Sequence, residues 1–261
     1  MDYFKSKKVL VTGASSGIGV AFARYLSIWG AELIITSRRK DRLEQLAAEL
    51  REEHDAEVTV IAADLSDPDG ARLLSDQLDK KGISVDILIN NAGFGYNGRF
   101  EDAPLETYEQ MMQVNMNSLV TLTRTLLPGM LERNHGGVLN VASMAGFLPI
   151  PYFGVYSATK QFVINLSWSL WHELKHTGVR VSVLCPGPVN TEFMDVAGVD
   201  KAKSAFRGLQ QADEVALRGL KGLAADQGMT LSRPLLRIPL LLSKWIPIKI
   251  GLMIGELAMK K

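Results

Sequence analysis

Short runs of aliphatic and β-branched residues alternate along this chain with longer stretches in which apolar residues recur every three or four positions. The helical spacing is clearest within residues 18–29 and 43–50, so each stretch can cover one face of a sheet. Strands that alternate with helices are typical of βαβ units, and the pattern predicts an α/β fold, a Rossmann-type doubly wound parallel sheet. The strands are expected at Lys8–Thr12, Glu32–Thr36, Glu57–Ala62, Asp86–Asn90, Val138–Ala142 and Arg180–Cys185, with a further short strand at Met229–Ser232.

The chain is predicted to form a single domain with an appended tail. Its 261 residues, 47% of them apolar, are enough to build a full core. No repeat, low-complexity linker or shift in composition precedes residue 231, so residues 1–230 are expected to be the Rossmann-type domain. Residues 231–261 differ, because they hold six of the 29 basic residues but one of the 28 acidic residues. They are expected to form a basic and apolar C-terminal extension.

The balance of charge argues against a nucleic-acid partner, since a net charge of +1 gives no global field that would attract a polyanion. The one cysteine, Cys185, excludes an intrachain disulfide and any metal site built from several cysteines, and it suits a reducing compartment. The first residues lack the apolar core of a signal peptide. We therefore expect a cytoplasmic protein without a bound metal ion.

The apolar residues of the tail need a partner, because a contiguous exposed apolar patch usually marks an interface. Pro234, Pro239 and Pro247 argue against one continuous helix and predict short helices. The stretch is also too interrupted to cross a bilayer, which takes about 20 consecutive apolar residues. Three partners stay open: the protein's own body, a second subunit of a homo-oligomer, with a dimer favoured, and an anionic lipid surface that would make the protein peripherally membrane-associated.

A glycine-rich turn joins the first predicted strand to the first predicted helix, with the spacing G-x-x-x-G-x-G from Gly13 to Gly19. Glycine lets the backbone approach a pyrophosphate, whose charge is favoured by the free N–H groups at the helix start. A tight turn needs glycine in any case, but the strand–turn–helix setting favours a dinucleotide site. Its expected contacts are Gly13, Ser15, Ser16, Gly17, Ile18 and Gly19.

Tyr156 and Lys160 stand four residues apart in a segment with helical spacing, so their side chains are expected on one face of a helix. A lysine cation beside a phenol favours the phenolate, and it would lower the tyrosine pKa from about 10 toward a value useful for proton transfer. The pair alone is common in proteins. Ser143 adds weight, because it follows a predicted strand, where open α/β sheets place their ligand contacts.

In their order along the chain, these motifs resemble those of the short-chain dehydrogenases/reductases. The resemblance covers about residues 5–228 and includes Asn90-Asn91-Ala92-Gly93, Asn115 in the run QVNMNS, and Pro186-Gly187. It implies a nicotinamide-dependent oxidoreductase whose Tyr156 is the acid or base and whose Ser143 orients the substrate oxygen. It also implies that Lys160 lowers the tyrosine pKa and holds the nicotinamide ribose, while Asn115 supports a water that links Lys160 to solvent.

The resemblance extends the expected cofactor site beyond the glycine-rich turn. Asn90 and Gly93 are expected to help position the cofactor, the pair after the third strand to contact adenine, and the segment after Pro186 to contact the nicotinamide carboxamide. The additional cofactor contacts implied in this way are Asp64, Leu65, Asn91, Ala92, Gly93, Tyr156, Lys160, Pro186, Gly187, Val189 and Thr191.

The end of the second predicted strand indicates which nicotinamide cofactor binds. NAD-selective Rossmann sites place an acidic residue there, whereas an arginine accommodates the 2′-phosphate of NADP. This chain has Ser37 about where the acid would stand, followed by Arg38 and Arg39. A guanidinium forms planar, charge-assisted hydrogen bonds with phosphate. We therefore expect NADP(H), selected mainly by Arg38; the alternative is that the two arginines only cap a solvated loop.

Two other features favour structural interpretations. His172-Glu173-Leu174-Lys175-His176 matches the H-E-x-x-H zinc signature, but catalytic zinc needs a third ligand, and His54 and His135 are expected to lie far away. The motif falls at the end of the helix that contains Tyr156, where histidines are expected to be solvated. Cys185 has no neighbouring base in sequence and is expected to be a buried strand residue.

The leading hypothesis is an NADP-dependent carbonyl reductase or alcohol dehydrogenase that acts on a lipophilic ketone or acyl chain. The tail supports it, because it replaces the Val-Asp-Gly-Gly-like ending of many tetrameric relatives and resembles the family branch with basic, apolar extensions. Residues 193–211 correspond to a mobile substrate cover without a recognisable charged pocket. Two alternatives are a reductase of small polar hydroxy acids or sugars, and a cofactor-sensing protein without catalysis, which the complete catalytic set argues against.

Overall fold

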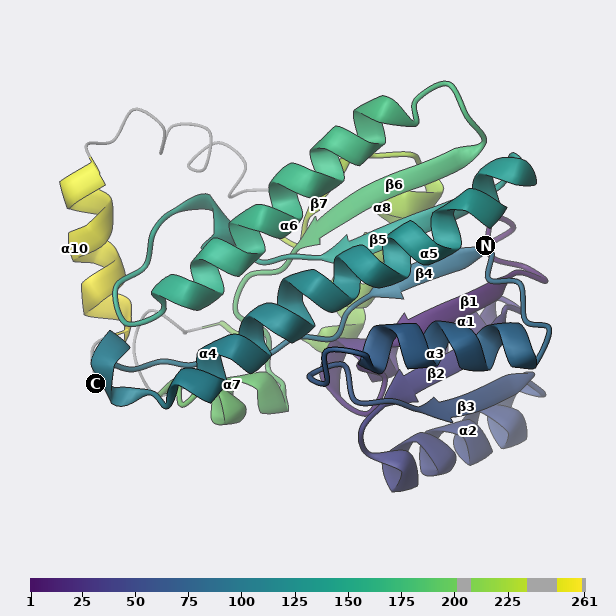
Figure 1. The fold of residues 1–261 in the computed structure, drawn as a ribbon, viewed down its shortest axis with the longest axis horizontal. Helices are drawn as coiled ribbons and strands as arrows, with labels where there is room; N and C mark the ends of the chain where they lie inside the picture. Colours follow the sequence, from purple (N-terminus) through teal and green to yellow (C-terminus); the bar gives the residue numbers. More distant parts are fainter. Residues whose placement is uncertain (201–207, 234–247, 260–261) are drawn as a thin grey trace.

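The computed structural model describes residues 1–200, 208–233 and 248–259. Its centre is a seven-stranded sheet with the order β3-β2-β1-β4-β5-β6-β7, and every pairing is parallel. Figure 1 shows helices on both faces of this sheet, so the predicted doubly wound fold is confirmed. The strands are β1 (Lys8–Thr12), β2 (Glu32–Ser37), β3 (Val58–Ala62), β4 (Ile87–Asn90), β5 (Gly136–Val141), β6 (Val179–Cys185) and β7 (Met229–Leu231).

All of the expected strands form, and the largest difference lies at the start of β5, which begins at Gly136 rather than at Val138. The hydrophobic pattern missed this start because glycine usually weakens a strand. Here the packing requires glycine. A Cβ on Gly136 would lie 2.7 Å from the Cβ of Met130, and one on Gly137 would lie 2.6 Å from the hydroxyl oxygen of Tyr3.

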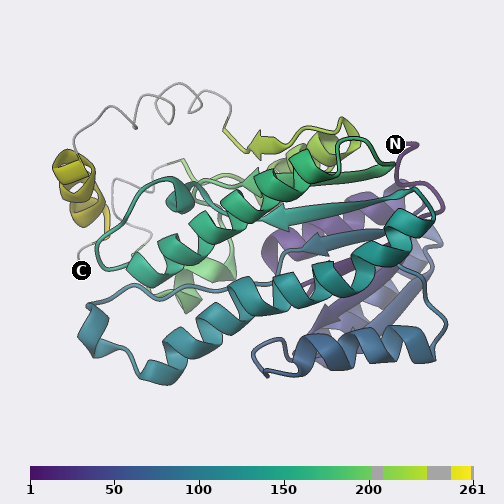
Figure 2. The same ribbon diagram turned by 45° about the horizontal axis from the view of Figure 1, so that its top comes forward.

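Figures 1 and 2 show a layer of helices on each face of the sheet. An apolar core lies between each layer and the sheet. One core contains Phe22 and Leu220, and the other contains Leu74 and Leu122, all of them fully buried. The apolar positions that recur in the sequence thus face the sheet, as the spacing predicts. The first layer consists of α1 (Gly17–Ile28), α2 (Lys40–His54) and α8 (Ala212–Ala224), and the second of α3 (Gly70–Lys80), α5 (Ser118–Glu132) and α6 (Gly154–Glu173).

The carboxyl ends of the central strands meet along one edge of the sheet. β1 leads directly into Gly13 and β4 into Asn91, while β5 ends shortly before Ser143 and β6 directly before Pro186. The strand order reverses between β1 and β4, because the chain adds β2 and β3 on one side of β1 and β4 to β7 on the other. Open α/β sheets bind their ligands at such a switch point.

The described part of the tail packs on the body of the protein. α10 (Ile248–Met259) lies beside the loop that connects β5 to α6, on the left of Figures 1 and 2. The side-chain amide of Asn97 donates a hydrogen bond to the carbonyl of Met259 over 3.2 Å, and a Cβ on Gly255 would lie 3.1 Å from the Cδ of Pro151. Residues 234–247 and 260–261 lie outside the described ranges, so the proposed contacts with a second subunit or a lipid surface stay predictions. Of the helices described, none is long and apolar enough to cross a membrane.

The H-E-x-x-H motif straddles the end of a helix. α6 ends at Glu173, so His176 lies beyond it, and His172 and His176 are both exposed, as expected for solvated histidines. The zinc signature requires both histidines on one helix, and here they do not share one. Within the described ranges, no group of three or more His, Cys, Asp or Glu side chains could hold a metal ion.

Candidate active site

The turn between β1 and α1 forms a cradle that requires glycine. A Cβ on Gly19 would clash with the carbonyl oxygen of Gly13, and one on Gly13 would lie 2.9 Å from the Cα of Ala92. Gly13 and Gly17 also have φ angles of 67° and 53°, which other residues rarely adopt. No described side chain caps α1 at Ser16, so the first N–H groups of the helix are available to an anion.

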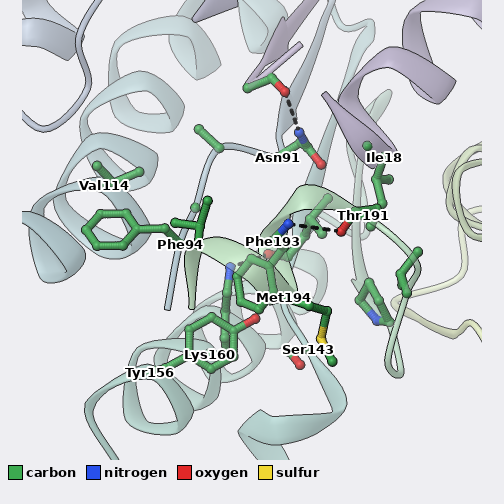
Figure 3. Close-up of a pocket in the computed structure, with 18 of the residues that line it drawn as sticks. Ile18, Asn91, Phe94, Val114, Ser143, Tyr156, Lys160, Thr191, Phe193 and Met194 are labelled. Carbon is green, nitrogen blue, oxygen red and sulfur yellow. Dashed lines mark hydrogen bonds between the residues drawn. The ribbon is translucent and has the colours of Figure 1, made fainter. Parts of the chain in front are cut away.

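Hydrogen bonds tie this cradle to the end of β4. The Thr12 hydroxyl accepts hydrogen bonds from the backbone N–H groups of Asn91 and Ala92 over 2.9 and 3.0 Å, and it donates to the carbonyl of Ile89. The Asn91 side chain donates to the carbonyl of Thr12 over 2.9 Å and to that of Gly13 over 3.3 Å, and the dashed line at the top of Figure 3 marks the hydrogen bond with the lining residue Gly13. Asn90 does not line the site: its buried amide donates to Thr123 and to Asn140, so its contribution is structural.

A cavity of about 620 Å³ runs along this edge of the sheet. Its size is that of a pocket for a small organic ligand. The structure brings most of the predicted site residues to its wall, whereas Gly19 and Asn115 do not line it. Those that line it are Gly13, Ser15, Ser16, Gly17, Ile18, Ser37, Arg38, Asp64, Leu65, Asn91, Ala92, Gly93, Ser143, Tyr156, Lys160, Pro186, Gly187, Val189 and Thr191.

Tyr156, Lys160 and Ser143 meet on one side of the cavity, as Figure 3 shows. Tyr156 and Lys160 lie on α6 and are only 6% and 4% exposed. The ring of Tyr156 is enclosed by Phe153 and Phe193, whose centroids lie 4.4 and 5.3 Å away. Ser143 is a hydrogen-bond partner of Tyr156. The phenol is therefore fixed in direction and shielded from water.

Burial controls the proton affinity of both groups on α6. It raises the pKa of Tyr156 above its ordinary value, and the hydrogen bond with Ser143 opposes this only in part. Burial also lowers the pKa of Lys160 to about 8, although the nearby Cys185 has the opposite effect. The expectation that Lys160 lowers the Tyr156 pKa stays a prediction, because burial is the larger influence on the phenol in this structure. The Lys160 ammonium lies 5.7 Å from the centroid of the ring and donates instead to the carbonyl of Val141 over 2.9 Å.

Cys185 is the last residue of β6 and is fully buried, as predicted. Burial raises the pKa of its thiol to about 12, and the Lys160 ammonium opposes this shift. The thiol is therefore protonated at neutral pH and is a poor nucleophile.

Asn115 supports the site from behind its wall. It lies in a π-helical turn, η2 (Gln113–Asn117), between α4 (Leu105–Met112) and α5. Its side chain accepts a hydrogen bond from the N–H of Phe94 and donates to the Phe94 carbonyl and to the Thr159 hydroxyl. A Cβ on Gly93 would lie 3.0 Å from the Asn115 Oδ1 and 3.2 Å from the Lys160 Nζ. The expected water between Asn115 and Lys160 stays a prediction.

The two arginines after β2 have different roles. Arg38 is exposed and lines the cavity, and no hydrogen bond or ion pair of its side chain is found among the described residues. Arg39 is engaged, because its guanidinium donates to the Ser15 hydroxyl over 3.0 and 3.1 Å and to the carboxylate of Glu192 over 2.8 Å. Ser37 accepts a hydrogen bond from the Arg39 N–H. The sequence motifs missed the contacts of Arg39 and Glu192, because they join segments far apart in the chain.

The far end of the cavity is apolar, and sequence motifs did not identify it. It extends from the Tyr156 ring to α7 (Glu192–Val196) and to α10 of the tail. The apolar side chains there come from distant segments, so no local motif could group them. They are Phe94, Leu148, Ile150, Phe153, Phe193, Met194, Val196, Val199 and Met259.

Replacing Lys160 with methionine is expected to raise the free energy of unfolding at pH 7 by about 1–3 kcal/mol, and by less at pH 9–10. Below a folded-state pKa of about 8 the native protein holds a buried cation, which destabilises it. Between about pH 8 and the ordinary value of 10.5, the unfolded chain binds more protons than the native state, so wild-type stability rises with pH. Urea unfolding of both proteins at several pH values measures the difference, and a difference independent of pH would contradict this account.

Comparison with known proteins identifies the family. The short chain dehydrogenase profile matches residues 7–201. The very-long-chain 3-oxoacyl-CoA reductase of Anas platyrhynchos is 36% identical over 194 residues, which cover 72% of this chain and 61% of that protein. The NADP-dependent 3-hydroxy acid dehydrogenase YdfG of Escherichia coli (strain K12) is 38% identical over 190 residues, or 72% of this chain and 75% of YdfG.

Solved structures agree with the sequence relatives. A short-chain dehydrogenase from Sphingobium yanoikuyae in complex with NADPH is similar with a TM-score of 0.83, at 32% identity and with 95% of both chains covered. This chain matches less than two thirds of the length of the Anas platyrhynchos reductase. It matches nearly all of the Sphingobium yanoikuyae dehydrogenase. The matched segment of the family profile contains β1 to β6, the glycine cradle and the Tyr156–Lys160 pair. The chain belongs to the short-chain dehydrogenase family.

Proposed function

We propose that the protein is an NADP(H)-dependent oxidoreductase that reduces a lipophilic ketone or acyl-chain carbonyl to the alcohol, or catalyses the reverse reaction. The observation that carries this proposal is the arrangement of the cavity. A glycine cradle suited to phosphates lies at one end, Ser143 and the buried Tyr156 and Lys160 lie beside the middle, and apolar side chains surround the other end. The family, the NADP-dependent relative and the NADPH complex of a structural neighbour support the same conclusion.

The residues of this chain divide the chemistry among them. When bound, the nicotinamide supplies or accepts a hydride. Tyr156, whose phenol keeps its proton at neutral pH, donates that proton to the carbonyl oxygen as negative charge develops there. Ser143 hydrogen-bonds the same oxygen and orients it toward the phenol. Lys160 is a fixed donor beneath the site and would hold the nicotinamide ribose.

The end of β2 supports NADP(H) over NAD(H). No acidic side chain stands there to bind a ribose 2′-hydroxyl, since the strand ends in Ser37 and is followed by Arg38 and Arg39. Arg38 lines the cavity, and its side chain has no hydrogen bond or ion pair with the described residues, so its five N–H donors are available to a 2′-phosphate. Arg39 lies closer to the cradle, on Ser15.

The apolar end of the cavity supports a lipophilic substrate. Among the described residues that line this end there is no lysine or arginine that could pair with the carboxylate of a small hydroxy acid. Desolvating such an anion without a partner would be costly. Met259, which belongs to the tail, closes this end, and the first relative's name refers to a very-long-chain acyl substrate. The intact proton-transfer group argues against a pure cofactor sensor.

Replacing Tyr156 with phenylalanine is expected to lower turnover at least about 100-fold while NADPH binding is retained. The phenylalanine ring can pack between Phe153 and Phe193 in the same way, but it has no proton to donate. Fluorescence titration with NADPH and single-turnover absorbance at 340 nm separate the two effects. Hydride transfer at a near wild-type rate in the purified variant would overturn the catalytic role.

Replacing Arg38 with alanine is expected to reduce the ratio of NADPH to NADH affinity by roughly 10- to 100-fold, the effect of one well-placed charge-assisted contact. The affinities of both cofactors should be measured for each protein. Arg72 of α3 gives a control, because it is an exposed arginine that does not line the cavity. If the ratio is unchanged in Arg38→Ala, the selectivity lies elsewhere, with Arg39 the next candidate.

A series of ketones of increasing chain length and polarity, assayed by NADPH oxidation, tests the substrate class. We expect kcat/KM to rise with chain length and to be lowest for carboxylates and sugars. Met259→Ala should lower kcat/KM for the long ketones about 3- to 10-fold, because it removes buried apolar surface, whereas Leu257→Ala on the same helix should not. Met259 is 6% exposed and lines the cavity, while Leu257 is 80% exposed. A preference for hydroxy acids or sugars would replace the lipophilic substrate with the polar alternative.

A further inference from the structure

A network of four side chains connects the cradle to α7. The carboxylate of Glu192, the first residue of α7, accepts hydrogen bonds from Arg39 over 2.8 Å and from Arg42 over 2.6 Å. Arg39 in turn donates to the hydroxyl of Ser15 in the glycine-rich turn. We refer to Ser15, Arg39, Arg42 and Glu192 as the clasp.

The clasp lies at the wall of the cavity, where it joins the cradle to α7. Ser15, Arg39 and Glu192 all line the cavity, whereas Arg42 does not. Glu192 lies 153 residues from Arg39 in the chain, so the contact closes a long loop. The two arginine hydrogen bonds hold the pKa of Glu192 below its ordinary value, so its carboxylate is ionised at neutral pH.

The helix held by the clasp also reaches the catalytic side chains. Phe193 follows Glu192 directly, and its ring centroid lies 5.3 Å from that of Tyr156. Its neighbour Met194 lines the apolar end of the cavity. The residues that follow α7 are held by a separate contact, because the Asn97 side-chain amide donates a hydrogen bond to the Gly198 carbonyl. Glu192 is therefore the point at which the start of α7 is attached to the cofactor side of the cavity.

We propose that Glu192 is a positioning residue that, through Arg39 and Arg42, closes α7 over the bound dinucleotide and so keeps Phe193 against Tyr156. The proposal rests on the proposed function, since it assigns the cradle to a dinucleotide. The clasp couples the two ends of the site: a change at the phosphate end alters the enclosure of the phenol. Glu192 does not contact the reacting atoms in this account. It acts through Phe193 and through the rate at which α7 opens.

Glu192→Gln tests the clasp, because it keeps the shape of the side chain and removes its charge. We expect amide hydrogen exchange in the cofactor-free protein to rise about 3- to 10-fold at Ala197 and Val199, whose N–H groups donate to Phe193 and Met194 carbonyls within the α7 segment. We also expect NADPH to dissociate about 3- to 10-fold faster in stopped-flow displacement. We expect Arg42→Gln to have a smaller effect of the same kind. This variant does not remove a group that lines the cavity.

Glu49→Gln is a matched control. Glu49 of α2 forms an ion pair of 3.2 Å with Arg24 of α1, and the two side chains are 36% and 50% exposed, comparable to the 46% and 39% of Glu192 and Arg39. Neither residue of this pair lines the cavity, so exchange at Ala197 and Val199 should match the wild type.

The outcomes distinguish the clasp from the proposed function. If wild-type protein binds NADPH and reduces a ketone, but Glu192→Gln matches it in both exchange and NADPH release, the clasp proposal is overturned. If exchange rises in Glu192→Gln while wild-type protein binds neither cofactor, the clasp is a structural latch and the proposed function fails instead. An equal rise in Glu49→Gln would show a global loss of stability and would also overturn the specific role of Glu192.

Discussion

The parallel pairing of β1 with β4 is the constraint on which the site depends. Its register sets Val11 opposite Ile89, and this brings Thr12 within hydrogen-bonding distance of the backbone after β4. The glycine cradle follows Thr12 directly. Gly93, shortly after β4, lies so close to Lys160 that a side chain at this position would crowd the ammonium. One strand register therefore fixes the distance between the phosphate end and the proton-transfer group. A shift of one residue would separate the two and turn the strand's side chains to the opposite face.

Burial then sets the chemistry of the group that this register positions. Desolvation penalises the charged form of each side chain, so it raises the pKa of Tyr156 and lowers that of Lys160. Both shifts favour the neutral forms. A protonated tyrosine can donate to an oxygen that becomes negative, but a raised pKa makes it a weaker acid, so the transfer depends on the orientation and charge stabilisation that the site supplies.

The fold and the cofactor side of the cavity wall could be predicted from the sequence, because both depend on local patterns. Apolar spacing identified the strands and the helix faces, and short motifs identified the residues at the strand ends. The failures share a physical origin: they depend on side chains that come from distant segments. The burial that raises the Tyr156 pKa depends in part on Phe193 of α7, which no motif near Tyr156 indicates. The Asn97–Met259 hydrogen bond joins residues 162 positions apart, and nothing in either local sequence indicates it.

The two segments that close the cavity, α7 and α10, follow Lys160 in the chain, and neither contributes a strand to the sheet. The sheet, α1 and α6 therefore hold the glycine cradle and the Tyr156 phenol. The apolar end is shaped by α7 and α10, which can change without moving the cradle or the phenol. The enclosure of Tyr156 is nevertheless not independent of α7, because Phe193 supplies part of the desolvation. Exposed ion pairs at Glu192 are individually weak. Because Glu192 directly precedes Phe193, a small change in these ion pairs can alter the access of water to the Tyr156 phenol, and Tyr156 is only 6% exposed.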